Sequence, residues 1–504
     1  MEKIAIIDLG SNNARLVLVK LMGNGNFVVF DELRESVRLG QDMERDGFLK
    51  PARIVQTIKT MKMFKRQCDA NRVDKIIAVG TAAVRSAKNQ KGFLEEVQST
   101  CGIKINVLSA QEEATLVYHG VINSMDIPKA VIVEIGGGST KIIHYNRRNL
   151  LNYETLPFGA VTLTDLFAAD ALKPEEQARK IEEFFTEQLS KIEWLKEIEP
   201  DVQLIGVGGS FRNVGKISRR IKKYPLEMAH NYVIPKDEFL NIYDMIKVLD
   251  LDKKMKIKGL SQGRADILPS AMALMKSFIN YTNFDKITIS GCGLREGLMF
   301  NYAVPTTLEK PIMDVLGHSL NTLVKYYDCN IAHVEHVNNL ATLLFKQLRV
   351  LHKYPRQYLK ILRVAALLHD SGLRIKFYNH HKHSAYIILN SNLYGISHRD
   401  ITMAAMVVAA YRKDDFHYSE WIKYKDLVSE DDLEIIKRLA VILRIAESFD
   451  RSVSQTIVGI NCDVLGDSVI MKTEVESDVS LEIKDALNAS LEFKKAFAKN
   501  LEIL

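Results

Sequence analysis

The chain has 504 residues, of which 47% are hydrophobic and 26% charged, a balance typical of a globular protein that is too long for a single core. Its formal net charge of +6 is too modest to indicate nucleic acid as a partner. No apolar run reaches the roughly 18–20 residues that cross a bilayer, so we expect no membrane association and a cytoplasmic location. The five cysteines are scattered and form no CxxC pair, which argues against a disulfide framework or a cysteine-based zinc site.

Short buried strands alternate with helical stretches from the start of the chain to about residue 303. This alternation predicts an α/β architecture with sheets that are at least partly parallel. Most of the strands run directly into Gly, Ser or Thr. The expected strands are Ile4–Ile7, Phe27–Phe30, Lys75–Val79, Lys104–Leu108, Ala130–Glu134, Gln203–Val207 and Lys286–Ile289.

Three glycine-containing loops share one design. Residues 8–12 (DLGSN), 134–140 (EIGGGST) and 206–210 (GVGGS) each lie at a strand end, and the first two echo each other. Glycine lets backbone N–H groups converge on phosphate oxygens, while Ser and Thr add hydroxyl donors and a carboxylate at the strand end can hold a divalent cation. One such loop is most often only a turn, but three in one α/β region predict a phosphate site.

A helix expected after residues 206–210 carries basic side chains at i, i+4, i+7, i+8 and i+11. These positions share one helical face, so they could form a track for an extended polyanion leading from the loops. A solvated helix face is the alternative, with about equal weight. The residues are Arg212, Lys216, Arg219, Arg220 and Lys223.

From about residue 304 the pattern becomes helical. Val337, Leu340, Leu344 and Leu348 recur at helical spacing, which predicts a mainly helical domain over residues 304–454. Two strands, Thr456–Leu465 and Ser468–Val475, then open a small α+β region over 455–504.

The helical region also carries histidines and aspartates in the order H…HD…D. His336 lies in HVEHV, His369 and Asp370 end RVAALLHD, and Asp450 ends LRIAESFD. This order resembles that of HD-type phosphohydrolases, in which such side chains bind divalent metals, so these four residues are a candidate second metal site. Helical spacing predicts that His369 points inward, and a structural His–Asp hydrogen-bonded pair is the alternative.

The loops and four further segments carry a specific resemblance. DLGSN and EIGGGST are similar to loops of the superfamily of actin, hexokinase and heat-shock chaperone ATPases (ASKHA). Residues 80–85 (GTAAVR), 109–114 (SAQEEA), 206–210 and 293–297 (GLREG) resemble the Ppx/GppA family of exopolyphosphatases and guanosine pentaphosphate phosphohydrolases. The resemblance implies an α/β fold of two actin-like, ribonuclease H-like half-domains (1–125 and 126–303), then an all-α HD-like domain (304–454) and a small C-terminal α+β domain (455–504).

The resemblance also implies roles for individual residues. Glu113 matches the family's catalytic glutamate, which would orient or deprotonate the attacking water. Asp8 and Glu134 would hold Mg²⁺ or another divalent cation. The implied phosphate-binding residues are Ser11, Asn12, Arg85, Gly137, Gly138, Ser139, Thr140, Gly209 and Ser210. For Glu113 taken alone, a helix cap after Ser109 is the alternative.

Two positions depart from the family pattern. The family usually has Asp where this chain has Glu134, and it usually has Glu where this chain has Lys141. The second change reverses a charge beside the expected metal and phosphate. Lys141 could bind the polyanion directly, or it could mark altered catalysis.

The resemblance favours a Mg²⁺-dependent exopolyphosphatase that processively releases terminal orthophosphate from inorganic polyphosphate, with guanosine pentaphosphate as a second candidate substrate. It implies a homodimer. One alternative is a catalytically altered sensor of polyphosphate or alarmone, suggested by Lys141, and another is a nucleotide phosphohydrolase acting through the HD-like domain. An actin-like kinase is disfavoured, because SAQEEA and GLREG resemble the hydrolases and no adenine-pocket signature is evident.

Overall fold

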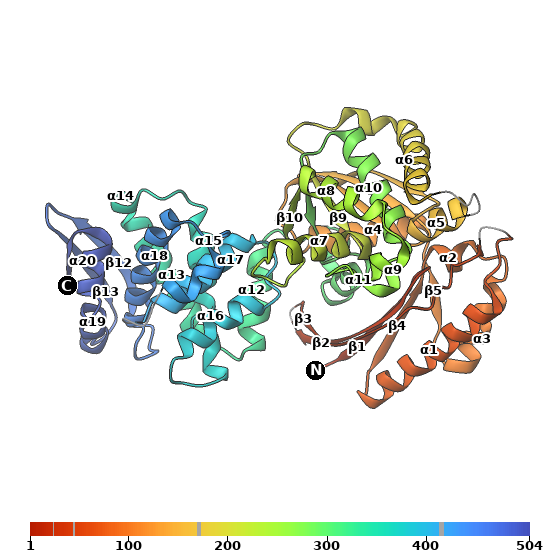
Figure 1. Cartoon of the computed structure of the whole chain (residues 1–504). Coiled ribbons are helices and arrows are strands. Elements are labelled where there is room, and N and C mark those ends of the chain that lie inside the picture. Colours follow the sequence, from red (N-terminus) through yellow and green to blue (C-terminus); the bar gives the residue numbers. More distant parts are fainter. Residues whose placement is uncertain (24, 44–45, 169–172, 413–417) are drawn as a thin grey trace. The chain divides into compact units, whose positions relative to one another are not determined.

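A computed structural model describes residues 1–504 except 24, 44–45, 169–172 and 413–417 (Figure 1). The chain forms two compact units, Met1–Val315 and Leu316–Leu504. No helix in the described part of the chain is long and apolar enough to cross a membrane.

The first unit begins with a five-stranded sheet in the order β3-β2-β1-β4-β5. Strands β1 to β3 form an antiparallel meander, and β4 and β5 continue the sheet in parallel with β1. The strands are β1 (Lys3–Leu9), β2 (Ala14–Gly23), β3 (Asn26–Glu35), β4 (Lys75–Gly80) and β5 (Ile105–Val107). The helices of this half are α1 (Pro51–Ala70), α2 (Ala82–Ser86), α3 (Gln90–Cys101) and α4 (Ala110–Ile122).

A six-stranded sheet in the order β10-β11-β9-β6-β7-β8 repeats this plan. Strands β6, β7 and β8 form an antiparallel meander. Strands β9 and β11 continue the sheet in parallel with β6, and β10 adds an antiparallel edge. The strands are β6 (Lys129–Ile135), β7 (Thr140–Asn146), β8 (Asn149–Leu156), β9 (Gln203–Val207), β10 (Tyr232–Pro235) and β11 (Lys286–Ile289). The helices are α5 (Ala160–Ala168), α6 (Pro174–Ser190), α7 (Gly209–Lys222), α8 (Lys236–Lys247), α9 (Leu251–Met255), α10 (Leu268–Thr282) and α11 (Leu294–Ala303).

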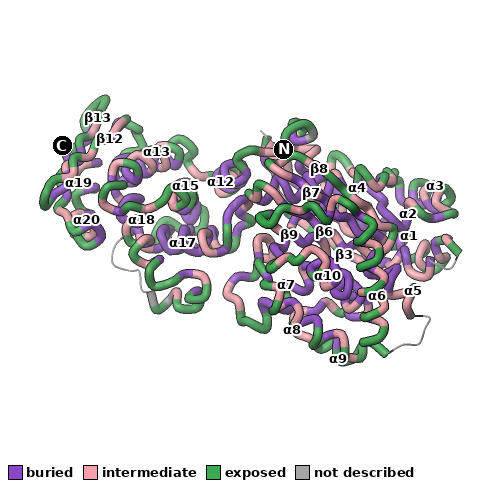
Figure 2. The backbone as a smooth tube through the Cα atoms, turned by 90° about the horizontal axis from the view of Figure 1, so that it is seen from above, coloured by how far each residue is buried: buried purple, intermediate pink, exposed green. Residues whose placement is uncertain are grey.

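Helices cover both sheets, and the central strand β6 is mostly buried whereas the edge strand β8 is exposed or half-buried along its length (Figure 2). The first sheet packs against α1 and α3, and the second against α5, α6, α7, α8 and α10. Helix α4 contacts both sheets, because Val117 shares one apolar cluster with Val79 of β4 and Ile132 of β6. A Cβ at Gly297 of α11 would lie 1.9 Å from the Leu116 carbonyl oxygen of α4, so only glycine allows these two helices to pack this closely.

The second unit is mainly helical and ends in a small sheet. Its helices are α12 (Val315–Tyr326), α13 (Ile331–Gln347), α14 (Arg349–His352), α15 (Tyr358–Leu368), α16 (His380–Asn390), α17 (His398–Ala410) and α18 (Glu430–Ser448). The sheet has the order β12-β13-β14, with one antiparallel and one parallel pairing. Its elements are β12 (Ile457–Val464), β13 (Ser468–Val475), α19 (Ser480–Leu487), α20 (Ser490–Phe497) and β14 (Asn500–Ile503).

The predicted fold class is confirmed: two actin-like α/β halves are followed by a helical region and a small α+β region. All seven strands expected before residue 303 are present, whereas β2, β7, β8 and β10 were not anticipated. The first two follow directly from glycine loops that were interpreted only as ligand-binding turns. Strand β10 has four residues and ends in Pro, and β8 mixes polar and apolar residues, so neither shows a buried-strand pattern. The four-domain division stays a prediction.

Candidate active site

The loops after β1 and β6 adopt the same turn and pack against each other. The Gly10 N–H donates to the Asn13 carbonyl at 3.0 Å, and the Gly136 N–H donates to the Ser139 carbonyl at 2.9 Å. A Cβ at Gly138 would lie 2.7 Å from Ser11 Oγ. Glycine therefore brings a loop from each sheet into contact, and the echo between the two sequence motifs reflects a repeated structural unit.

The third loop leads from β9 into α7. Gly208 has a φ of +98°, which favours glycine, and a Cβ at Gly209 would lie only 2.2 Å from Arg264 Nη2. The glycine pair thus turns the chain and lets a guanidinium lie directly against the backbone.

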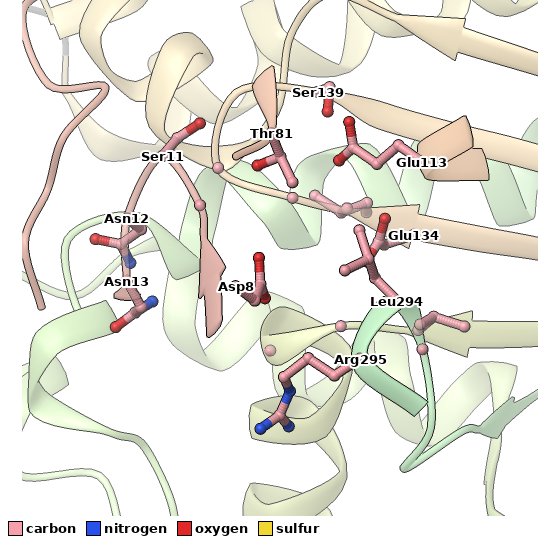
Figure 3. A pocket seen from close by; sticks show the side chains of 18 of the residues that line it. Asp8, Ser11, Asn12, Asn13, Thr81, Glu113, Glu134, Ser139, Leu294 and Arg295 are labelled. Carbon is pink, nitrogen blue, oxygen red and sulfur yellow. The ribbon is translucent and has the colours of Figure 1, made fainter. Parts of the chain in front are cut away.

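The three loops line one pocket with about 820 Å³ of empty space. In Figure 3, Asp8 lies between the loop of Ser11, Asn12 and Asn13 and the side chain of Glu134. The pocket brings together ten of the residues singled out in the sequence: Asp8, Ser11, Asn12, Glu113, Glu134, Gly137, Gly138, Ser139, Gly209 and Arg212. Arg85, Thr140 and Ser210 are not among its lining residues.

Glu113 lies in the first turn of α4 and does not cap the helix. The cap is a reciprocal pair in which Ser109 Oγ accepts from the Glu112 N–H and the Glu112 carboxylate accepts from the Ser109 N–H. The capping alternative for Glu113 is therefore wrong. Its side chain, with the residue only 3% exposed, is available for other partners.

Two basic side chains hold the Glu113 carboxylate. Arg85 Nη1 donates to Oε2 at 2.8 Å and also to the Leu108 carbonyl, while Lys141 Nζ donates to Oε1. Burial raises the pKa of Glu113, but Lys141 and Arg85 together outweigh it and hold the pKa below its ordinary value. Arg85 was expected to bind phosphate. In this structure it pairs with Glu113 instead and is not among the residues that line the pocket.

Lys141 also contacts Glu134, its cross-strand partner in the β6–β7 pair. Its Nζ lies 3.0 Å from Glu134 Oε2, and its side chain is only 2% exposed. Burial lowers the pKa of Lys141, but the two glutamates outweigh burial and raise it above its ordinary value. Lys141 is thus a buried ammonium shared between the predicted catalytic and metal-binding carboxylates.

Three further arginines, which sequence reasoning missed, line the pocket. They are Arg15, Arg264 and Arg295. Burial and neighbouring guanidiniums lower the pKa of Arg264 to about 9, and burial with Arg212 and Arg295 lowers that of Arg15 to about 10. Arginine stays protonated at neutral pH, so these shifts indicate charge that an anion would stabilise. Arg295 belongs to the GLREG segment, which supported the family resemblance but was given no role in binding. Arg15 and Arg264 belong to no recognised motif.

The basic wall continues into a neighbouring pocket of about 580 Å³. The two pockets share Arg15, Arg212 and Arg295, and the second adds Arg34 and Lys216. We call these two pockets together the basic path.

The predicted helical track is therefore wrong in part. Arg212 and Lys216 lie on the basic path, but Arg219 is buried with its guanidinium 5.1 Å from the centre of the Tyr232 ring. Arg220 is exposed and pairs with Glu227 at 2.9 Å, and Lys223 is the exposed residue that ends α7. The other cations of the path come from β2, β3 and α11 and from the segment before α10.

Asp8 and Glu134 suit a divalent cation. Both carboxylates line the pocket formed by the three loops, and Mg²⁺ is commonly held by one or two carboxylates together with substrate phosphates. Burial raises the pKa of Asp8, with Arg15 opposing it, so a nearby cation would favour its ionised form. The donor set fits such an ion even with Lys141 on one oxygen of Glu134.

The second predicted metal set needs one correction. His369 is fully buried, as expected, but the histidine beside it and Asp370 is His333, three residues before His336. Asp450 contacts His333 Nδ1 at 2.7 Å. His336 is outside this group, although the same HVEHV segment contains both histidines, so motif order alone could not choose between them.

The chain matches two sequence models of one family. That of the Ppx/GppA phosphatase family matches residues 18–304, and that of Ppx/GppA phosphatase domain III matches residues 316–495. A guanosine-5'-triphosphate,3'-diphosphate pyrophosphatase of Aeromonas salmonicida is 26% identical over 453 residues, which cover 88% of this chain and 86% of the relative.

Solved structures resemble about three fifths of the chain. The crystal structure of an Aquifex aeolicus member of the Ppx/GppA family is 26% identical, has a TM-score of 0.52, and covers 60% of this chain and 98% of its own. An exopolyphosphatase from Cytophaga hutchinsonii, at 23% identity and a TM-score of 0.56 over 60% of this chain and 98% of its own, shows the same fold. The chain therefore belongs to the Ppx/GppA phosphatase family and is a hydrolase of phosphoric anhydrides.

Proposed function

We propose that this hydrolase processively releases terminal orthophosphate from inorganic polyphosphate, with guanosine pentaphosphate as a second substrate. The basic path carries this proposal. It supplies six cations, Arg15, Arg34, Arg212, Lys216, Arg264 and Arg295, that extend from the glycine loops into a second pocket. A chain of phosphates carries about one negative charge per unit, so it matches a continuous path of cations better than a single small anion does.

The terminal phosphoryl group would lie at the glycine loops. Five small residues of the loops line the pocket there, and their backbone N–H groups and hydroxyls would suit phosphate oxygens: Ser11, Gly137, Gly138, Ser139 and Gly209. The next phosphates would meet Arg212, Arg264 and Arg295. Phosphoryl transfer depends mainly on positioning and charge neutralisation, which these residues supply.

Glu113 would position the attacking water. With both oxygens held by cations and its pKa lowered, its carboxylate is a weak proton acceptor at neutral pH. We therefore assign it to orienting water beside the terminal phosphorus, with Arg85 and Lys141 fixing its rotamer.

Asp8 and Glu134 would hold a divalent cation, Mg²⁺ being the first candidate. When bound, such an ion supplies charge neutralisation for the oxygens of the scissile anhydride. Lys141 already neutralises one oxygen each of Glu113 and Glu134, so fewer cations are needed to balance these carboxylates.

The relative from Aeromonas salmonicida is named for a guanosine pentaphosphate substrate, which supports that compound as the second substrate. A sensor is the alternative that Lys141 favours, because an ion-paired Glu113 could bind a polyanion without hydrolysing it. A nucleotide phosphohydrolase acting through the helical unit is the third reading, and it would depend on His369 and Asp370.

Phosphate release from long-chain polyphosphate, measured with and without Mg²⁺, tests the proposal. We expect turnover by the wild type and a loss of about 10²- to 10⁴-fold in Glu113→Gln with binding retained. Glu112→Gln is the matched control: it makes the same change one residue earlier and keeps a side chain that can cap the helix, so turnover should persist.

Binding without turnover by the wild type would favour the sensor. Equal turnover by Glu113→Gln would refute its assignment, and loss only in His369→Ala or Asp370→Ala would move the reaction to the helical unit. Faster hydrolysis of guanosine pentaphosphate than of polyphosphate would reverse the order of the two substrates.

A further inference from the structure

Three potential metal ligands converge in the helical unit. His333 comes from α13, and His369 and Asp370 directly follow α15; one ligand atom from each lies within 4.8 Å of the other two. Asp370 Oδ2 is 3.6 Å from His333 Nε2, and Asp370 Oδ1 is 3.5 Å from His369 Nε2. Two ligands of a tetrahedral ion with bonds of about 2.0 to 2.2 Å lie about 3.4 Å apart, so both imidazoles are at a suitable distance from the Asp370 carboxylate to share an ion with it.

His369 presents a lone pair to this group. Its Nδ1 lies 2.7 Å from the Ala366 carbonyl oxygen, which can only accept, so Nδ1 carries the proton and Nε2 does not. His369 is 0% exposed, and its Nε2 has no hydrogen-bond partner among the residues that the structure describes. Buried polar atoms are rarely left without a partner, and a metal ion would supply one.

His333 is oriented in the way typical of metal-binding imidazoles. Its Nδ1 lies 2.7 Å from Asp450 Oδ2, so Nδ1–H donates to the carboxylate and the Nε2 lone pair faces Asp370. The other oxygen of Asp450 accepts from the Gln455 N–H at 2.8 Å, and Asp450 is 1% exposed. Asp450 therefore positions His333 and is not itself a ligand.

A fourth imidazole supports Asp370. His380 Nε2 lies 3.3 Å from Asp370 Oδ1 and 3.1 Å from the Tyr411 hydroxyl, while its Nδ1 lies 2.9 Å from the Phe377 carbonyl oxygen. Nδ1 donates to that carbonyl and Nε2 lies within reach of both Asp370 and Tyr411, so both ring nitrogens of His380 already have partners. The Asp370 side chain is 18% exposed, so solvent reaches the group from its side.

We infer that His333, His369 and Asp370 form a three-ligand site for one divalent transition-metal ion, with Asp450 as its positioning residue and water in the open position. Imidazole nitrogen favours ions such as Zn²⁺ and Co²⁺, whereas Mg²⁺ prefers oxygen. The site therefore differs in chemistry from the carboxylates Asp8 and Glu134, and the inference does not depend on the proposed polyphosphate reaction.

Metal content tests the inference directly. The full chain is stripped with EDTA, incubated with excess Zn²⁺, desalted and analysed by mass spectrometry for bound zinc. We expect one Zn²⁺ per chain in the wild type and in Asp8→Asn, and none in His333→Ala or His369→Ala. His336→Ala is the matched control from the same helix and should keep its zinc; Asp450→Asn should bind it ten- to one-hundredfold more weakly.

Co²⁺ absorption and thermal unfolding separate loss of metal from loss of fold. The wild type and His336→Ala should show the visible bands of imidazole-bound Co²⁺ and a Tm raised by Zn²⁺. His369→Gln should melt cooperatively but show neither effect. A wild type without stoichiometric zinc, a His369→Gln that retains it, or a His336→Ala that loses it would overturn the assignment.

Discussion

The two units carry sites of opposite electrostatic character. In Met1–Val315 the candidate active site gathers buried guanidiniums, and burial together with neighbouring guanidiniums lowers the pKa of Arg15 and of Arg264. In Leu316–Leu504 the proposed metal site gathers imidazole lone pairs and a carboxylate. The first arrangement favours an anion and the second a cation. The two sites therefore suit different kinds of ligand.

Lys141 makes the first site unlike an ordinary carboxylate metal centre. Its ammonium, part of a side chain of the protein itself, forms ion pairs with both Glu113 and Glu134 and holds them in place. In the helical unit the acidic oxygens of Asp370 face imidazoles, which a metal can bridge. The first site therefore already holds one cation of the protein itself, whereas the proposed second site would gain its cation only by binding a metal.

Replacing Lys141 with Met should have the largest effect. It leaves the buried Glu113 and the partly buried Glu134 without their shared partner, and breaking a buried ion pair costs about 3–5 kcal/mol; we expect about 3 kcal/mol, because Arg85 still pairs with Glu113. Chemical denaturation measures this. Lys129→Met is the matched control: Lys129 lies on β6 and also pairs with two carboxylates, but these are exposed, so its loss should be far smaller.

The same variant should shift the acid response. In the wild type the pKa of Glu113 lies below its ordinary value, so its ion pairs stabilise the fold above that value and are lost as pH falls through the lowered pKa. Without Lys141 the main cause that opposes burial is removed, so the pKa of Glu113 should rise and the acid limb of the rate profile should move to higher pH. Since a raised pKa means that the fold binds the proton more tightly than the unfolded chain, the stability deficit of Lys141→Met should shrink as pH falls. An unchanged acid limb would show that Lys141 does not control Glu113.

Arg264→Gln should have an intermediate effect, of opposite sign on stability and on binding. Arg264 is 8% exposed, its Nε has no hydrogen-bond partner among the described residues, and three arginines repel its guanidinium. Its removal should raise the Tm of the free protein but weaken polyphosphate binding about ten- to one-hundredfold, since a charge-assisted hydrogen bond contributes about 1.5–3 kcal/mol.

Arg220→Gln is the control for this comparison, because Arg220 lies on α7 but is exposed and paired with Glu227. Thermal unfolding with and without inorganic phosphate, together with KM for polyphosphate, measures both effects. A KM that rises equally in the two variants would refute the basic path and favour a diffuse basic surface.

Local patterns predicted the strands and loops of the active site, but not its charges. Glu113 and the three glycine loops were recognisable because each lies within a few consecutive residues. The arginines were not, since Arg15, Arg264 and Arg295 are brought together only by the packing of two sheets. Helical spacing placed Arg219 on the track, yet tertiary packing buried it against Tyr232. Likewise, HVEHV offers two histidines, and only the rotation of α13 selects His333 over His336.

Ionic strength should have the smallest effect and separates the two sites most simply. The basic path acts through charge over several ångströms, and the Debye length falls from about 10 Å at 0.1 M salt to about 3 Å at 1 M. We expect KM for long polyphosphate to rise several-fold between about 0.05 M and about 0.5 M KCl, and less so in Lys216→Gln, which removes an exposed cation of the path. Zinc retention should hardly change over that range, because coordinate bonds act at contact distance. Equal salt sensitivity of both sites would mean that long-range charge, and not the imidazole lone pairs, attracts the cation to the helical unit.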